Sequence, residues 1–124
     1  MADRARRKRR RLSRSGEFER VYREGRSHAS RHLVVYAFPR AEGDPEPRLG
    51  LSVGRKLGGA VDRNRVKRQL RDAFWKNAES LKDGHDFVIV ARPSAGELAE
   101  QGEGALAEAL QAVLADAGLA KGAK

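Results

Sequence analysis

The stretch Gly54–Trp75 (GRKLGGAVDRNRVKRQLRDAFW) constrains the fold more than any other part of the chain. Its apolar residues recur at the spacing of one face of an α-helix: Val66, Leu70, Ala73 and Phe74. At about 100° per residue, the opposite face carries Asn64, Arg68, Arg71 and Trp75, with Arg65 and Lys67 towards its flanks. The segment therefore predicts an amphipathic helix with one side on a core and the other side open to a partner.

The same stretch is strongly basic. Eight Lys or Arg residues, counting Lys76 directly after it, stand against only Asp62 and Asp72. The planar fork of an arginine can bond two phosphate oxygens at once and stays charged at any ordinary pH. A solvated face that only keeps the protein soluble is the alternative. The density of arginine and the scarcity of acidic neighbours favour a polyanion-binding face.

The chain as a whole is also basic. The chain has 124 residues, the length of one domain with a modest core, and a net charge of +9 at pH 7. Residues 1–15 have a balance of +7, whereas residues 93–124 have a balance of −3. Because the positive charge gathers in the N-terminal arm and the central helix, it favours a directed surface for a polyanion.

The composition excludes several classes of protein. There is no cysteine, so disulfides and thiolate metal sites are excluded. No apolar run approaches the roughly 20 residues that span a bilayer. No apolar h-region follows the cationic N-terminus, as it would in a signal peptide. We therefore expect a cytoplasmic protein without a membrane partner.

The chain divides into three parts by composition. Residues 1–13 form a basic, flexible arm with too few apolar residues to fold alone. Residues 14–118 form the single folded domain, and residues 119–124 form a frayed tail.

The domain opens with a predicted helix. Ser13 or Ser15 caps it, Glu17 lies in its first turn, and Gly25 ends it. One face of this helix carries Phe18, Val21 and Tyr22. The two aromatic residues belong either to the core or to a binding surface, and the spacing alone leaves both open.

Two strands are predicted next. The segment Leu33–Phe38 (LVVYAF) is rich in β-branched and aromatic residues. Its residues alternate between two apolar faces: Leu33, Val35 and Ala37 on one, and Val34, Tyr36 and Phe38 on the other. The strand is therefore either covered on both sides or binds something flat with its second face. Pro39–Pro47 predicts a hairpin loop, and Arg48–Val53 predicts the returning strand.

The remaining segments complete the fold class. Gly58 and Gly59 predict the turn into the central helix, with Asp62 as its N-cap. The later elements are a turn at Lys82–Asp86, a strand at Phe87–Ala91 ended by Arg92 and Pro93, and a helix from about Glu103 to Ala117. The buried stripe of that helix is Leu106, Ala109, Leu110, Val113 and Leu114. The order helix, two or three strands, helix, strand, helix predicts an α+β sandwich, with one mainly antiparallel sheet and helices packed on it.

No catalytic constellation is found in the polypeptide. The histidines His28, His32 and His85 lack metal-ligand spacing. Ser52 and Ser94 have no recognisable nucleophile context. Any enzymatic role would therefore come through a partner.

Three segments together carry a family resemblance. In order and spacing, RLSRSGEFERVYREG, LGLSVGRKLGGAVDRNRVKRQLRDAFW and DFVIVAR closely resemble the protein subunit of bacterial ribonuclease P. The similarity runs from about Arg10 to Arg92, and its most specific part is Arg63-Asn64-Arg65 followed by Lys67-Arg68 and Arg71. The Pro93-Ser94-Ala95 segment and the Ala- and Glu-rich segment after Gly96 depart from the family pattern.

The resemblance implies a ribonucleoprotein that removes the 5′ leader of precursor transfer RNA. Its catalyst is an RNA, and its magnesium ions are held mainly by that RNA and the substrate. The catalytic RNA would be contacted by Arg55, Lys56, Arg63, Asn64, Arg65, Lys67, Arg68 and Arg71. A cleft for the single-stranded leader would contain Phe18, Tyr22, Val34 and Tyr36, with Arg92 nearby. The resemblance also implies a left-handed βαβ crossover and a fold shared with a domain of a small-subunit ribosomal protein.

Two other functions remain open. A small ribosomal or assembly protein would share the basic arm and the α+β fold but would not stimulate cleavage of a precursor. A DNA-binding regulator would place the basic helix in the major groove, but the chain lacks helix-turn-helix spacing, so we expect no DNA partner.

Overall fold

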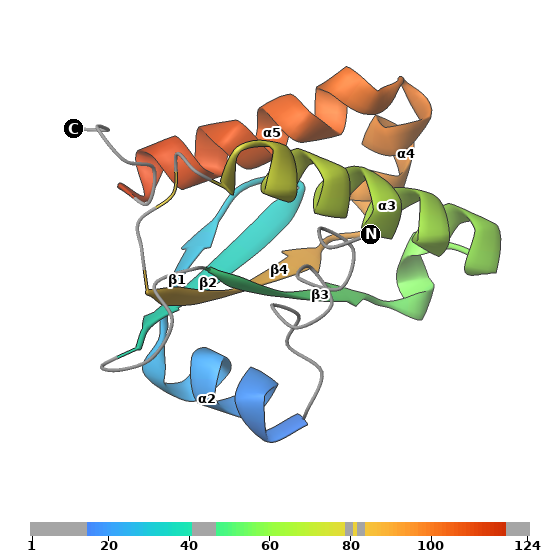
Figure 1. The fold of residues 1–124 in the computed structure, drawn as a ribbon. Coiled ribbons are helices and arrows are strands. Elements are labelled where there is room, and N and C mark those ends of the chain that lie inside the picture. Colours follow the sequence, from blue (N-terminus) through green and yellow to red (C-terminus); the bar gives the residue numbers. More distant parts are fainter. Residues whose placement is uncertain (1–14, 41–46, 79–80, 82–83, 119–124) are drawn as a thin grey trace, which may run out of the picture.

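The structure, a computed structural model, describes residues 15–40, 47–78, 81 and 84–118. Four strands form one sheet: β1 (Arg26–Ala29), β2 (Leu33–Pro39), β3 (Arg48–Val53) and β4 (His85–Ala91). The helices are α2 (Ser15–Glu24), the short 3-10 helix η1 (Arg55–Leu57), α3 (Ala60–Lys76), α4 (Ser94–Glu100) and α5 (Glu103–Asp116). Helix α2 lies on one side of the sheet, and α3, α4 and α5 lie on the other (Figure 1). The predicted α+β architecture is confirmed.

The order of the strands differs from the predicted hairpin. The sheet order is β1-β2-β4-β3, so β4 lies between β2 and β3. Strand β2 pairs with β4 antiparallel, from Leu33 opposite Ala91 to Pro39 opposite His85. Strand β3 pairs with β4 parallel. The hairpin is therefore wrong, because β4 is apolar on both faces and takes the centre of the sheet. The predicted loop lies mostly in residues 41–46, outside the described residues.

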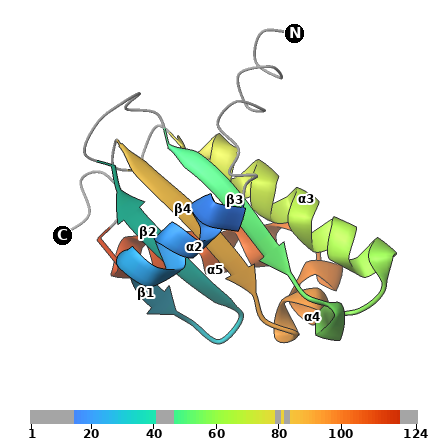
Figure 2. The same ribbon diagram turned by 90° about the horizontal axis from the view of Figure 1, so that it is seen from below.

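The parallel pair β3–β4 is joined through α3, which makes a βαβ crossover. Figures 1 and 2, which view the sheet from two perpendicular directions, show that this crossover is left-handed. Such connections are right-handed in about 98% of cases. The exception implied by the resemblance is confirmed.

Helix α2 ends where the sequence predicts. The backbone N–H of Gly25 donates to the carbonyl of Val21 at 2.9 Å. A Cβ at Gly25 would lie 2.5 Å from that carbonyl oxygen and 2.7 Å from the carbonyl oxygen of Ala37. The turn from α2 into β1 therefore requires glycine. Of the two predicted caps, Ser13 lies outside the described residues and Ser15 is the first helical residue.

Helix α3 begins earlier than its predicted cap. Its N-cap is Gly59, and Asp62 lies in the first turn, where the helix dipole favours an acid. The predicted apolar stripe is buried, together with Gln69. Trp75 was predicted on the outward face, but it is half-buried against the core, with its ring 4.9 Å from that of Phe74. The indole is therefore only partly exposed on the outward face of α3.

The main core lies between the sheet and helices α3, α4 and α5. The strand residues that point to it are Leu33, Val35 and Ala37 from β2, Leu49 from β3, and Phe87, Ile89 and Ala91 from β4. We call this side of the sheet the core face. Helix α5 confirms the predicted last helix, whereas α4 was not predicted. Within the described part of the chain, no helix is long and apolar enough to cross a membrane.

Candidate nucleic-acid interface

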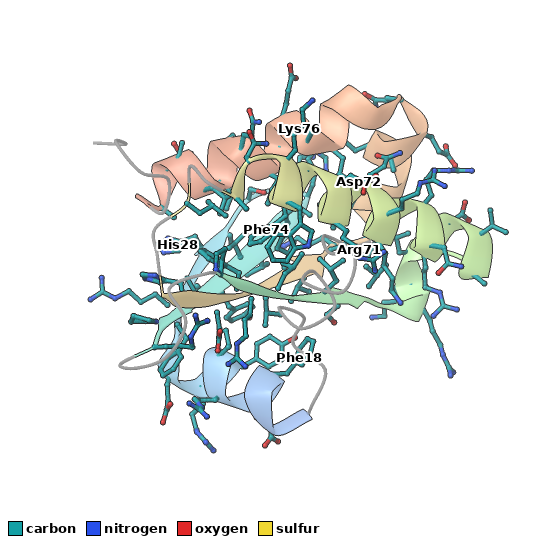
Figure 3. All side chains as sticks on the ribbon, in the orientation of Figure 1. Phe18, His28, Arg71, Asp72, Phe74 and Lys76 are labelled. Carbon is teal, nitrogen blue, oxygen red and sulfur yellow. The ribbon has the colours of Figure 1, made fainter. Side chains whose placement is uncertain are left out.

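Most of the predicted RNA-contacting residues gather on and before α3. We call the set Arg55, Lys56, Arg63, Asn64, Arg65, Lys67, Arg68 and Arg71 the basic surface. Arg55 and Lys56 are exposed in η1, and Asn64, Arg68 and Arg71 are exposed on α3. Figure 3 shows Arg71 and Phe74 on α3, with Phe74 pointing towards the sheet. The amphipathic pattern thus places a row of polar and cationic groups away from the core.

The residues of the basic surface are not equally exposed to solvent. Arg63, Arg65 and Lys67 are partly buried. The Nε of Arg63 is buried and has no hydrogen-bond partner among the described residues. An anion can therefore reach Arg68 more easily than it can reach Arg63.

Arg65 has two acidic neighbours. Its Nη1 lies 3.6 Å from Oδ1 of Asp62, three residues earlier on α3, and 3.9 Å from Oε1 of Glu100 at the end of α4. The side chain of Arg65 is 35% exposed. Such loose surface pairs contribute little stability, about 0–1 kcal/mol. They leave Arg65 available to a phosphate but hold it near α4 in the free protein.

The opposite side of the sheet carries a second, smaller cluster. Val21 and Val88 are fully buried, and Phe18, Tyr36, Phe38 and Val90 pack around them half-buried. We call this side of the sheet, with the α2 residues that lie on it, the aromatic face. Helix α2 lies over β2 and β4, with β3 beside it (Figure 2), and Phe18 points from α2 towards the sheet (Figure 3).

Aromatic rings form a connected row on this face. The rings of Phe18 and Tyr22 are 6.3 Å apart, and those of Tyr22 and Tyr36 are 4.8 Å apart in an edge-to-face arrangement. Tyr22 is 39% exposed, although it is a large aromatic residue. Burial raises the pKa of Tyr22, while a hydrogen bond with Ser52 of β3 acts in the opposite direction. The bond connects α2 to β3, and the phenol stays neutral at physiological pH.

The row continues beyond the predicted residues. The guanidinium of Arg20 lies 5.7 Å from the ring centre of Phe38, a cation–π contact. The predicted members Phe18, Tyr22 and Tyr36 are together on the aromatic face, and Val34 is half-buried on the same side of β2. Phe38, Ser52 and Arg20 were not predicted as site residues. The alternation along β2 could have identified Phe38, because it shares a strand face with Val34 and Tyr36.

Arg92 lies at one end of this face. It is exposed directly after β4, and its backbone N–H donates to the carbonyl of His32 at 2.9 Å. His32 contacts Ser94: its Nδ1 lies 2.8 Å from the Ser94 Oγ. The Ser94 hydroxyl also donates to the carbonyl of Arg31 at 3.2 Å. These two contacts hold Ser94, the first residue of α4, against Arg31 and His32.

A buried ionic cluster closes the other end. Asp86, only 2% exposed, receives two hydrogen bonds from Arg48, at 2.8 Å from Nε and 2.7 Å from Nη2, and one from Nη1 of Arg40. Burial alone would raise the pKa of Asp86, but the hydrogen bonds and charges of Arg48 and Arg40 outweigh it and lower the pKa. The cluster joins the ends of β2, β3 and β4.

The acidic residues that the structure describes do not form a magnesium site. Across the described ranges, no group of three His, Cys, Asp or Glu side chains lies close enough to hold a metal ion. Both oxygens of the buried carboxylate Asp86 accept hydrogen bonds from arginines. Asp86 is therefore occupied by its arginine partners and does not offer a free carboxylate to a metal ion.

The family model described as Ribonuclease P matches residues 7–117. The chain belongs to the ribonuclease P protein family. The ribonuclease P protein component of Bacillus pumilus is 44% identical over 91 residues, 73% of this chain and 76% of that protein. The component of Halalkalibacterium halodurans is 45% identical over 97 residues, 77% of this chain and 81% of that protein.

Solved structures of the family agree. The RNase P protein of Staphylococcus aureus is 34% identical with a TM-score of 0.80, over 88% of this chain and 95% of that one. The RNase P protein of Thermotoga maritima is 30% identical with a TM-score of 0.73, over 83% of this chain and 94% of that one. This chain is thus a protein subunit of ribonuclease P, the endoribonuclease of transfer RNA 5′ processing, and its partner is the ribonuclease P RNA.

Proposed function

We propose that the two surfaces of this ribonuclease P protein divide the work of RNA recognition. The basic surface binds the catalytic RNA, and the aromatic face binds the single-stranded 5′ leader of precursor transfer RNA. The observation that carries this proposal is the placement of the two surfaces. Exposed cations lie on the outward face of α3, and partly exposed aromatic rings lie on the opposite side of the sheet. One protein can therefore contact both RNAs at once.

The chemistry of each surface suits its proposed ligand. Arginines such as Arg68 and Arg71 can bond phosphate oxygens without reading sequence, as docking on a folded RNA backbone requires. Rings such as Phe18, Tyr22 and Tyr36 can stack unpaired bases, worth roughly 1–3 kcal/mol per base and tolerant of sequence. A processing enzyme meets many precursors with unrelated leaders, so sequence-tolerant contacts are appropriate.

The reaction itself belongs to the RNA in this proposal. The polypeptide supplies cations that offset phosphate repulsion between the catalytic RNA and its substrate. The magnesium ions, held by RNA and substrate, supply the hydrolytic chemistry. Offsetting the repulsion lowers the magnesium concentration that the complex needs. Arg92, at the end of the aromatic face, is placed to contact a leader phosphate.

The first experiment is cleavage of precursor transfer RNA by a bacterial ribonuclease P RNA at low magnesium, with and without this protein. We expect strong stimulation with the correct mature 5′ end. If the protein binds that RNA tightly without stimulating cleavage, a ribosomal or assembly role takes the place of this proposal.

A second experiment locates the RNA-docking surface. The double variant Arg65→Ala, Arg68→Ala should bind the ribonuclease P RNA more weakly at moderate salt while its thermal unfolding is unchanged. Arg26→Ala, which removes an exposed cation from the edge strand β1, is the matched control and should bind normally. Equal binding by the double variant and the control would place the docking surface elsewhere.

A further inference from the structure

Helix α4 was not predicted and carries none of the residues proposed to contact RNA, yet it touches the elements that do. Its start is tied to the end of the sheet. Ser94 bonds both His32 and the Arg31 carbonyl, and the N–H of Ala95 donates to the carbonyl of Arg92 at 2.9 Å. From this fixed start, α4 runs between η1, α3 and α5. It is thus a rigid support next to the basic surface.

The closest of these contacts joins Gly96 to Leu57. A Cβ built on Gly96 would lie 3.1 Å from Cδ2, 3.3 Å from Cγ and 3.3 Å from the carbonyl oxygen of Leu57. These distances are tighter than ordinary van der Waals contact, and one of the partners is backbone. A Cβ at this position would require Leu57 to move by a few tenths of an ångström, so glycine allows the closest approach of α4 to η1.

The segment η1 is short and contacts both α3 and α4. It is three residues long, and its closing hydrogen bonds, Leu57 N–H to Gly54 O and Gly58 N–H to Arg55 O, are both 3.2 Å. None of its residues is fully buried, and Leu57 is its one apolar side chain, packed half-buried on the core. Arg55 and Lys56, the two residues that precede Leu57, are exposed.

Two more contacts place α4 against α3. The Nε2 of the buried Gln69 donates to the carbonyl of Ala99 at 3.2 Å, and Glu100 lies 3.9 Å from Arg65. The same short helix therefore contacts both η1 and the middle of α3. Through it, the positions of Arg55 and Lys56 are fixed relative to those of Arg65 and Arg68.

We propose that Gly96 is a positioning residue of the basic surface: it seats η1 against α4, so that Arg55 and Lys56 stand in line with the cations of α3. The inference rests on the proposed function, because it requires that Arg55 and Lys56 contact RNA. Gly96 itself touches no RNA.

The test is a graded series at Gly96 with a matched control. Gly96→Ala and Gly96→Val push η1 away from α4 by increasing amounts. Gly104 lies in helix α5 with nothing within 4 Å of an added Cβ, so Gly104→Ala and Gly104→Val make the same chemical changes without contact. Binding to a bacterial ribonuclease P RNA is measured at several salt concentrations, and folding is checked by thermal unfolding.

We expect the affinity of Gly96→Val to fall on the order of tenfold at moderate salt, with a smaller loss for Gly96→Ala and none for the Gly104 variants. The slope of log affinity against log salt should fall by about one to two units, because one or two phosphate contacts are lost. A purely structural defect would lower the folded fraction without changing this slope. Leu57→Ala removes the side chain on the other side of the same contact and should lower the RNA affinity and the salt slope in the same way. It replaces Gly96→Val as the test if Gly96→Val does not fold.

A double-mutant cycle shows whether Gly96 acts through η1. If it does, adding Gly96→Val to Arg55→Ala, Lys56→Ala should weaken binding no further. Two outcomes would overturn the inference and leave the proposed function standing. The first is that the losses from the two sets of substitutions add. The second is that both Gly96 variants and Leu57→Ala bind with normal affinity and salt slope while Arg55→Ala, Lys56→Ala binds weakly. If Arg55→Ala, Lys56→Ala binds normally, the role proposed for η1 in RNA binding is wrong, and the inference fails with it.

Discussion

The two faces of the sheet are built from the same strands but are closed to different degrees. On the core face, 18 buried residues form one cluster under α3, α4 and α5. On the aromatic face, the fully buried apolar residues within the described ranges are Val21 and Val88, and their aromatic neighbours stay half-exposed under helix α2. The alternation of strand residues supplies apolar groups to both faces. Among the described elements, the helices that cover each face decide which of those groups are buried.

This difference separates stability from recognition. A sealed core contributes free energy of folding in proportion to the apolar area removed from water. A partly exposed row of aromatic rings contributes less free energy of folding, but its ring faces remain available to stack on bases. Substitutions on the core face should therefore act on folding, and substitutions on the aromatic face should act on binding.

The largest effect is expected from Phe74→Ala on the core face. Phe74 is fully buried, with its ring 5.4 Å from that of Phe87. Its loss leaves a cavity, so we expect the free energy of unfolding to fall by about 3–5 kcal/mol. Denaturant unfolding measures this change, with Ala112→Gly on the exposed side of α5 as a helix control of about 1 kcal/mol. A loss below that of the control would contradict the assignment of Phe74 to a sealed core.

A smaller loss is expected at the ionic end of the aromatic face. Asp86→Asn leaves Arg40 and Arg48 without their shared carboxylate. Since Arg48 is partly solvated, we expect a cost of about 2–3 kcal/mol, below the 3–5 kcal/mol of a fully buried pair. Equal unfolding free energies for the variant and the natural chain at pH 7 would show that the cluster contributes nothing to folding.

The same carboxylate sets a pH dependence. The pKa of Asp86 is lowered in the folded protein, so its contribution to stability is present above the ordinary value of 3.8 and is lost as the pH falls through the folded pKa. Thermal unfolding from pH 6 down to pH 2 should show a decline that is shallower in Asp86→Asn. Parallel curves would exclude Asp86 as its source.

On the aromatic face itself, Tyr36→Ala should act mainly on binding. Tyr36 is half-buried and touches Tyr22, so its loss should destabilise the fold less than Phe74→Ala does. Losing one stacking surface should weaken binding of precursor transfer RNA by roughly 1–3 kcal/mol. Mature transfer RNA, which has no leader, should bind as before. Equal losses for both RNAs would place the leader elsewhere.

The sequence predicted the pieces of this fold better than their connections. The bounds of β3 and the stripe of α5 were correct, because local periodicity determines them. The hairpin was wrong because neighbours along the chain usually pair, whereas here the centre of the sheet goes to β4, the strand that is apolar on both faces. The left-handed crossover came from the family resemblance alone. No local pattern could have supplied it.

The candidate site shows the same limit. The helical period of α3 predicted which cations face outward, and the alternation of β2 put Tyr36 and Phe38 on one side. The sequence could not show that Glu100 approaches Arg65, or that Arg48 and Asp86 meet, because these contacts join residues more than 30 positions apart. The period of α3 also misplaced Trp75, whose large ring turns back onto the core beside Phe74.

The smallest effect distinguishes two arginines of the basic surface. Arg68 is exposed on α3, whereas the Nε of Arg63 is buried. Arg68→Ala should weaken binding of the ribonuclease P RNA by about 1 kcal/mol and lower the salt slope by about one unit, if Arg68 contacts one phosphate. Arg63→Ala should change the slope less. Neither variant should change the preference for precursor over mature transfer RNA, which Tyr36→Ala should reduce. If Arg68→Ala reduced that preference while Tyr36→Ala did not, the two surfaces would have to exchange the ligands proposed for them.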